Sequence, residues 1–352
     1  MVEVKARSHR KVAALLNNAW REVLPRAFAF LCLLLLTAHC SLPNAFAASW
    51  TRQPSGTMAW LHAVYFLDQN RGWVAGSNGA LLRTTDGGGS WSKVAVSKDD
   101  LRDVYFANQE VGWLLAQRDV FKLKANERAS YLLNTTDGGA TWHKVFIETT
   151  DVNTRFTRML FTDEQHGWLL GETGVVFATG DGGAHWLSQR SASRHLLLGG
   201  AFGNSGRGLI VGAGGTIMQS NIGSAWNLRS AASDNARLNA AAMVGNFAWI
   251  VGNAGEMFAS ADGGRTWFRQ RSNVGSNLFD VRFIDAREGW AVGAQGTVLH
   301  TTDGGLHWLA ASTETSAALE RLCLVDRDHV WTVGFGGTIL RLGESPAPRL
   351  RD

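Results

Sequence analysis

The sequence predicts an all-β fold, a seven-bladed β-propeller of four-stranded antiparallel blades, and three observations support this prediction. An eight-residue phrase, Thr-Thr-Asp-Gly-Gly-Leu-His-Trp at residues 301–308, returns four more times along the chain. With one degenerate copy included, the tryptophans that end the phrases follow one another at intervals of 40 to 51 residues, which is a repeat period. Strand patterns recur seven times at this period, and the one strand missing near the C-terminus is present near the N-terminus.

The repeated phrase is predicted to close a β-hairpin. Further copies occupy residues 84–91, 135–142, 179–186 and 260–267, and a degenerate copy without the acidic residue occupies 220–226. The carboxylate can accept hydrogen bonds from backbone N–H groups a few residues later, and the glycines tolerate positive φ. This pattern resembles the Asp-box, or BNR repeat, of sialidases and related β-propellers. We therefore assign a structural role to its five aspartates, Asp86, Asp137, Asp181, Asp262 and Asp303.

Residues 278–310 show one repeated unit in order. A strand at 278–284, a second at 289–293 and a third at 297–300 are joined by short turns, and the phrase leads into a fourth strand at 308–310. Matching first strands are predicted to begin near Leu61, Leu101, Phe156, Leu196, Leu238, Leu278 and Leu319. The seventh unit ends near residue 341 without the phrase, so we expect residues 50–53 to supply its fourth strand and close the ring.

Residues 1–47 are predicted to be a secretory signal peptide. Basic residues precede an apolar run at 27–38, and Ala45-Phe46-Ala47 offers small residues before a cleavage site at Ala48. The run is too short for a comfortable membrane span, so no transmembrane segment is expected after cleavage, although retention of the leader as an anchor stays open. The remaining chain divides into a propeller at 48–343 and a disordered C-terminal tail at 344–352.

Charge and cysteine content narrow the class of protein. The leader holds six of the 34 Lys and Arg residues and two of the 30 Asp and Glu residues, so the exported part is neutral, with 28 of each sign. A neutral chain gives no reason to expect nucleic-acid binding. Cys323 is the one cysteine outside the leader, so disulfides are excluded and a buried, inert thiol is expected. We expect a monomer.

No catalytic residue, metal site or cofactor site is predicted. Glycoside hydrolysis needs two carboxyl groups within roughly 5 to 10 Å, whereas the phrase aspartates are spread around the rim of a propeller. The Phe/Tyr-Arg-Ile-Pro segment of sialidases is absent from the sequence. A carbohydrate-binding or sialidase-type glycoside-hydrolase-like protein of the cell envelope nevertheless remains the alternative.

Three repeated patterns point to a closer resemblance. Leu-x-x-Val-x-Phe, Gly-Trp-x-Val-Gly and the turn phrase together resemble the Ycf48/Hcf136 family of photosystem II assembly and stability factors and its relatives in non-photosynthetic bacteria. The resemblance implies a non-enzymatic scaffold in the periplasm, or in the thylakoid lumen of a photosynthetic host. Its implied partner is a subunit or assembly intermediate of a membrane-protein complex. The identity of this client and the nature of the host stay open.

A basic surface on blades two to four is predicted to bind the partner. Blade two has an insertion at residues 117–128, on the face that the second-to-third strand turns share with the connections between blades. The turn phrases lie on the other face, which is predicted to stay free. Long excursions from compact repeats are uncommon unless they serve a function or are disordered, although a merely solvated rim is the alternative. The predicted binding residues are Arg118, Lys122, Lys124, Arg128, Arg155, Arg158 and Arg194.

Overall fold

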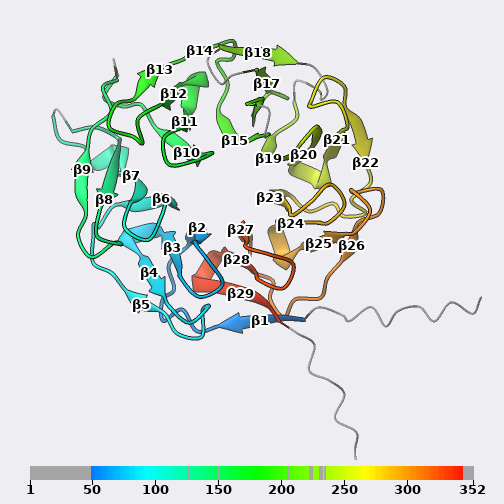
Figure 1. The fold of residues 1–352 in the computed structure, drawn as a ribbon, viewed down its shortest axis with the longest axis horizontal. Helices are drawn as coiled ribbons and strands as arrows, with labels where there is room; N and C mark the ends of the chain where they lie inside the picture. Colours follow the sequence, from blue (N-terminus) through cyan, green and yellow to red (C-terminus); the bar gives the residue numbers. More distant parts are fainter. Residues whose placement is uncertain are drawn as a thin grey trace, which may run out of the picture. The chain divides into compact units, whose positions relative to one another are not determined.

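Seven sheets, each with four antiparallel strands, are arranged around a ring, with the first strand of each blade innermost (Figure 1). The structure, a computed structural model, describes residues 49–125, 127–149, 151–203, 206–221, 225–229, 233 and 235–343. These belong to one structural unit, Ala48–Asp352. The predicted signal peptide and C-terminal tail lie outside the described residues. The described residues contain no helix long and apolar enough to cross a membrane.

In blades one to six the four blade strands follow one another along the chain from the innermost to the outermost position. Blade one contains β2 (Leu61–Phe66), β3 (Gly72–Gly76), β4 (Leu81–Thr84) and β5 (Ser92–Lys93). Blade two contains β6 (Asp100–Phe106), β7 (Gly112–Gln117), β8 (Ser130–Thr135) and β9 (His143–Val145). Blade three contains β10 (Phe156–Phe161), β11 (Gly167–Gly171), β12 (Val176–Thr179) and β13 (Leu187–Ser188). Blade four contains β15 (Leu197–Phe202), β16 (Gly208–Gly212), β17 (Ile217–Ser220) and β18 (Ala225–Arg229), and β14 (Arg190–Ser191) lies outside β18. Blade five contains β19 (Leu238–Val244), β20 (Phe247–Gly252), β21 (Met257–Ser260) and β22 (Phe268–Gln270).

Blades six and seven complete the ring. Blade six contains β23 (Leu278–Phe283), β24 (Gly289–Gly293), β25 (Val298–Thr301) and β26 (Leu309–Ala310). Blade seven contains β27 (Leu319–Leu324), β28 (Val330–Gly334), β29 (Thr338–Gly343) and the N-terminal β1 (Ser49–Gln53). Short 3-10 turns join the second and third strands of five blades: η1 (Ser77–Gly79), η3 (Glu172–Gly174), η4 (Asn253–Gly255), η5 (Ala294–Gly296) and η6 (Phe335–Gly337). Another, η2 (Val120–Lys122), lies in the blade-two insertion.

The core between neighbouring blades is a stack of aromatic rings. The tryptophan of a second strand stacks on the phenylalanine that ends the first strand of the next blade, as in Trp73 on Phe106, with ring centroids 3.7 Å apart. Trp331 stacks in the same way on Phe66, at 3.6 Å, and so joins blade seven to blade one. The repeated Trp and Phe positions therefore form the contacts between blades, and burial of these large apolar surfaces stabilises the ring.

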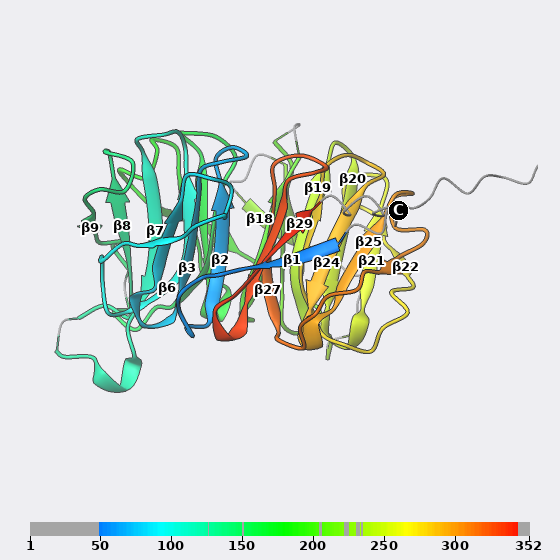
Figure 2. The same ribbon diagram turned by 90° about the horizontal axis from the view of Figure 1, so that it is seen from below.

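The predicted ring closure is confirmed. Strand β1 pairs antiparallel with β29, with Trp50 opposite Leu342, so the N-terminal strand is the outermost strand of blade seven (Figure 2). Trp50 is 5% exposed and packs in a cluster with Trp290 and Leu340. The chain ends therefore share one sheet, which covers an edge that an open array would leave unpaired.

The Asp-box phrases form hairpin turns, as predicted. In blade one, Asp86 Oδ1 accepts a hydrogen bond from the Ser90 N–H at 2.9 Å, and Thr84 Oγ1 accepts one from the Gly88 N–H at 2.9 Å. Gly87 and Gly88 have φ values of 69° and 93°, which favour glycine. Equivalent hydrogen bonds to the aspartate recur in blades two, three, five and six. The hairpins need no ligand to hold them.

Two faces of the propeller follow from this strand order. The Asp-box hairpins contact the loops between first and second strands, as in the hydrogen bond from the Gly87 N–H to the Asn70 carbonyl at 2.9 Å. We call this side the Asp-box face. The turns between second and third strands contact the connections between blades, as in the bond from the Glu172 N–H to the Arg155 carbonyl at 3.0 Å. We call this side the connection face.

Blade four has one feature that was not predicted. Its first strand begins at Leu197, close to the predicted Leu196. Strand β14 also pairs in parallel with β18, with Arg190 opposite Ala225, so this sheet has five strands. The chain between blades three and four runs along the outer edge of β18, where unpaired backbone groups accept an additional strand.

Candidate functional site

The blade-two insertion projects from the connection face. Figure 2 shows it as the teal segment that extends beyond the ends of the strands. Asp119 begins the short turn η2, because its Oδ1 accepts a hydrogen bond from the Phe121 N–H at 3.0 Å. Phe121 is 96% exposed at this turn, although large apolar side chains are usually buried.

A concave surface of about 730 Å³ lies at the base of the insertion. We call it the insertion cleft. Its basic side chains come from three loops and strand β9, and they are Lys98, Arg118, Lys122, Lys144 and Arg155. Four acidic residues, Asp99, Asp100, Asp119 and Glu127, line it as well. The cleft therefore has mixed charge: acidic side chains lie among the predicted basic residues Arg118, Lys122 and Arg155.

Two of the predicted binding residues hold the insertion in place. Arg118 lies over the ring of Tyr131, 4.5 Å from its centroid, and pairs with Asp99 at 3.6 Å. Its Nη1 also donates to the Arg128 carbonyl at 2.6 Å. Arg128 in turn donates from Nη1 to Thr149 Oγ1 at 2.8 Å. Both guanidinium groups bind other residues of the protein, so their removal would disturb the shape of the cleft.

The other predicted residues of the insertion are more accessible. Lys122 and Lys124 are exposed, and Lys122 pairs with Asp119 at 3.1 Å. Arg155 lines the cleft and donates from Nη2 to Gln117 Oε1 at 3.1 Å. Arg194 is exposed but does not line the cleft.

Arg158 does not lie on this surface, which corrects the sequence-based assignment. It lies on β10 and is 6% exposed, with Nη1 3.5 Å from Asp103 Oδ2 of blade two. It lines a cavity of about 160 Å³ among the innermost strands, together with Arg282 and Arg321. Alternation along a first strand directs Arg158 toward the centre of the ring, where burial lowers the pKa of its guanidinium to about 10.

The innermost strands contain the same polar arrangement twice. Asp103 accepts hydrogen bonds from the Val104 N–H at 3.1 Å and, across the blade boundary, from the Met159 N–H at 2.9 Å. Asp280 accepts equivalent bonds from Val281 and Leu322, both at 3.0 Å. Burial alone would raise the pKa of Asp280, but the guanidinium groups of Arg282, Arg158 and Arg321 hold it below its usual value.

This cluster of buried charged residues was not predicted from the sequence, although the shared position of its members in the first strands could have indicated it. Asp103, Arg158, Asp280 and Arg321 all lie two residues after the first large apolar residue of their strands. An alignment of the seven first strands by position would have placed four charged residues in one ring. The arrangement joins blades, because each of the two aspartates bonds to the backbone of the following blade.

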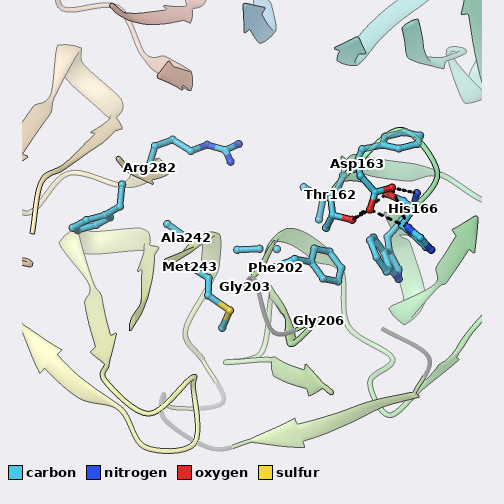
Figure 3. Close-up of a pocket in the computed structure, with 15 residues that line it drawn as sticks. Thr162, Asp163, His166, Phe202, Gly203, Gly206, Ala242, Met243 and Arg282 are labelled. Carbon is cyan, nitrogen blue, oxygen red and sulfur yellow. Dashed lines mark hydrogen bonds and ion pairs between the residues drawn. The ribbon is translucent and has the colours of Figure 1, made fainter. Parts of the chain in front are cut away.

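A larger cavity of about 740 Å³ adjoins the central cluster (Figure 3). In Figure 3, Arg282 extends from one wall, while Thr162, Asp163 and His166 form the facing wall. The Asp163 carboxylate is occupied, since Oδ1 accepts from the His166 N–H at 2.8 Å and contacts His166 Nδ1 at 3.0 Å. Within the described residues there is no group of three His, Cys, Asp or Glu side chains that could hold a metal ion.

Cys323 lies in the core between blades seven and one. Its Sγ accepts a hydrogen bond from the Phe66 N–H at 3.2 Å. Burial raises the pKa of the thiol to about 11, so the group is protonated at neutral pH. Cys323 is half-buried, whereas full burial was predicted, and a protonated thiol is a poor nucleophile.

Comparisons with known proteins show that the chain is similar to one family of proteins. The family model described as "Photosynthesis system II assembly factor YCF48" matches residues 42–150, 98–194, 192–274 and 269–342. A photosystem II assembly lipoprotein Ycf48 of Synechococcus sp. (strain CC9902) is 27% identical over 150 residues, which are 41% of each chain. The Ycf48 lipoprotein of Trichormus variabilis is 33% identical over 99 residues, or 26% of this chain and 28% of the relative. The matched regions thus span less than half of these relatives' length.

Solved structures show the same fold over a larger part of the chain. A structure described as YCF48 bound to D1 peptide superposes with a TM-score of 0.70 at 20% identity, covering 85% of this chain and 96% of the other. YCF48 from Cyanidioschyzon merolae gives a TM-score of 0.69 at 19% identity, over 84% and 99%. A GH74 xyloglucanase from Xanthomonas campestris gives 0.66 at 14% identity, over 86% and 55%. At these identities the likeness shows the fold alone.

Proposed function

The chain belongs to the family of photosynthesis system II assembly factor YCF48, and we propose that it binds a segment of a membrane-protein subunit during assembly and catalyses no reaction. The observation that supports this proposal is the family match, which extends over the whole ring from residue 42 to residue 342. The solved relative bound to D1 peptide supports a peptide segment as the ligand class.

We place the binding surface at the insertion cleft. Propellers repeat one supersecondary unit, so a segment that only one blade possesses is not needed to close the ring. The cleft offers Phe121 as an exposed apolar contact and Lys122 and Lys124 as exposed cations beside it. Because acidic residues lie among the basic ones, the cleft would bind only a ligand that carries charges of both signs or makes largely apolar contacts.

The site of action in this proposal is outside the cytoplasm. The basic and apolar leader at residues 1–47 supports export to the periplasm, or to the thylakoid lumen if the host is photosynthetic. Disulfides are not needed there, because neighbouring blades bury apolar and aromatic side chains between them. The client in such a compartment would be a membrane-protein segment that faces the same side.

Site-specific photo-crosslinking in the native host tests the proposal. A photoreactive amino acid at position 121 should yield an adduct that contains a subunit of a membrane-protein complex. The matched control is the same amino acid at Asn70, an exposed residue on the Asp-box face, which should yield no such adduct. An adduct at position 70 alone would contradict the assigned surface, and adducts free of membrane proteins at both positions would contradict the proposed function.

A further inference from the structure

A second concave surface lies between blades five and six on the Asp-box face. It has a volume of about 510 Å³, and we call it the blade five–six groove. Its apolar lining comes from Phe247, Trp249, Phe268 and Leu306. Three of these are exposed although they are large: Phe247 by 43%, Phe268 by 65% and Leu306 by 76%. Clustered exposed apolar side chains mark interaction surfaces on soluble proteins.

The fold does not require apolar residues at these positions. Phe268 directly follows the tryptophan of its Asp-box, and the equivalent residues are Ser92 and His143 in blades one and two and the exposed Leu187 and Leu309 in blades three and six. Leu306 occupies the sixth position of its phrase, where the other copies have Gly89, Ala140, Ala184 and Arg265. The hairpin closes equally well with these smaller or charged residues, so its geometry does not account for Phe268 or Leu306.

Hydrogen bonds hold the floor of the groove in a defined shape. Trp249 Nε1 donates to the Gly304 carbonyl at 2.9 Å, and the Gln270 amide donates to the same carbonyl at 3.2 Å. Gln270 Oε1 accepts from Trp308 Nε1 at 3.2 Å. The indole of Trp249 also stacks on Phe283, with centroids 3.5 Å apart. Because residues of both blades take part, the groove is a preformed site, which limits the entropy lost on binding.

The rim of the groove is cationic. Arg269 and Arg271 line it and are exposed, and Arg287 is adjacent, since its carbonyl accepts from the Gly304 N–H at 2.7 Å. Among the described residues, Arg271 and Arg287 form no ion pair. Asp303 is the one acidic residue in the lining, and its carboxylate is occupied by Thr301 and His307.

We propose that the blade five–six groove binds an extended acidic peptide that inserts bulky apolar side chains between Phe247, Phe268 and Leu306. Carboxylates that flank the apolar residues would pair with Arg269, Arg271 and Arg287 at the rim. A concave floor suits an inserted side chain, whereas a flat bilayer would reach only the rim. The groove lies on the face opposite to the insertion cleft, so the proposal stands independently of the function proposed above.

Fluorescence anisotropy with the purified protein tests this assignment. The probe is a fluorescein-labelled peptide, Asp-Glu-Leu-Phe-Asp-Glu with an amidated C-terminus, and the comparison probe replaces its four acidic residues by Lys. The acidic probe should bind saturably, and more weakly as salt is raised, while the basic probe should not bind. Phe268→Ser and Leu306→Ser should each raise the Kd by about tenfold, and R271E should raise it further at low salt.

The matched control is Leu187→Ser, because Leu187 is 69% exposed and follows the Asp-box tryptophan of blade three, but does not line the groove. This variant should bind the acidic probe as the unaltered protein does. Circular dichroism establishes that each variant is folded. The proposal is overturned if the folded unaltered protein fails to bind the acidic probe, or if Leu187→Ser weakens binding as much as Phe268→Ser. Cosedimentation with anionic lipid vesicles that is lost in the groove variants, without peptide binding, would assign the surface to a membrane instead.

Discussion

Asp103 of blade two and Arg158 of blade three form a buried ion pair, with Oδ2 and Nη1 3.5 Å apart at the centre of the ring. Both side chains are less than a tenth exposed. A charged group at this depth is stable only when it is paired and hydrogen-bonded. The pair therefore joins neighbouring blades and at the same time removes Arg158 from the surfaces available to a partner.

Substitution of Arg158 by Met should destabilise the fold, because Asp103 would keep a buried charge without its cation. We expect the free energy of unfolding in urea to fall by about 3 kcal/mol. The matched control is Arg327→Met, since Arg327 also pairs with acids but is 63% exposed, and we expect a loss of less than about 1 kcal/mol there. Equal losses in the two variants would contradict a structural role for the central pair.

Ring closure by β1 predicts a large effect of Trp50. Trp50→Ala removes a ring that is 5% exposed in the closing sheet, and we expect a loss of about 3–5 kcal/mol. Deletion of residues 48–55 should cost at least as much, because the edge of β29 then loses its partner strand. Thr51→Ala, on the exposed side of the same strand, serves as the control and should change stability little. A melting temperature that is unchanged in the deletion variant would refute closure through β1.

The Asp-box aspartates predict loss of stability in acid. The hydroxyl and N–H of Ser90, followed by the Thr84 hydroxyl, lower the pKa of Asp86 to about 2, and hydrogen bonds from His185 lower that of Asp181 to about 2. A carboxyl whose pKa is lower in the folded state stabilises the fold above its unfolded pKa, near 4, and loses this contribution as pH falls toward 2. The melting temperature should therefore fall between about pH 4 and pH 2.

A pair of variants isolates this pH effect. D86N should flatten part of the decline below pH 4, because its side chain does not titrate. The control is Glu148→Gln, an exposed acid for which the described residues provide no hydrogen bond, and it should leave the profile unchanged. Identical pH profiles for D86N and the unaltered protein would show that the hairpin carboxylate does not stabilise the fold in this way.

Cys323 should resist thiol reagents while the protein is folded. Its pKa of about 11 leaves almost no thiolate at pH 8, and its half-buried sulfur accepts a hydrogen bond from the Phe66 N–H. Reaction with Ellman's reagent should thus be slow in buffer and complete in concentrated guanidinium chloride. Fast reaction of this one thiol in the folded protein would disprove its protonated state.

The sequence by itself was sufficient for the architecture. The Asp-box turn depends on hydrogen bonds between residues four apart, such as Asp86 and Ser90, so its eight letters predict its structure wherever they occur. The period of the tryptophans gave seven blades, and the placement of Trp50 before the first blade predicted the closing strand. These features are local or periodic, and both kinds of information are visible in a linear chain.

Only the tertiary structure decided which charged and apolar residues meet. Arg118 and Arg158 belong to the same predicted basic set, yet one lies over Tyr131 at the insertion cleft and the other is buried beside Asp103. The blade five–six groove likewise forms from Phe268 of one blade and Leu306 of the next. The alternation of a strand tells which face a side chain occupies, but its partner depends on how closure of the ring positions neighbouring blades. Contacts across those boundaries therefore follow from distances in space that the order of residues does not contain.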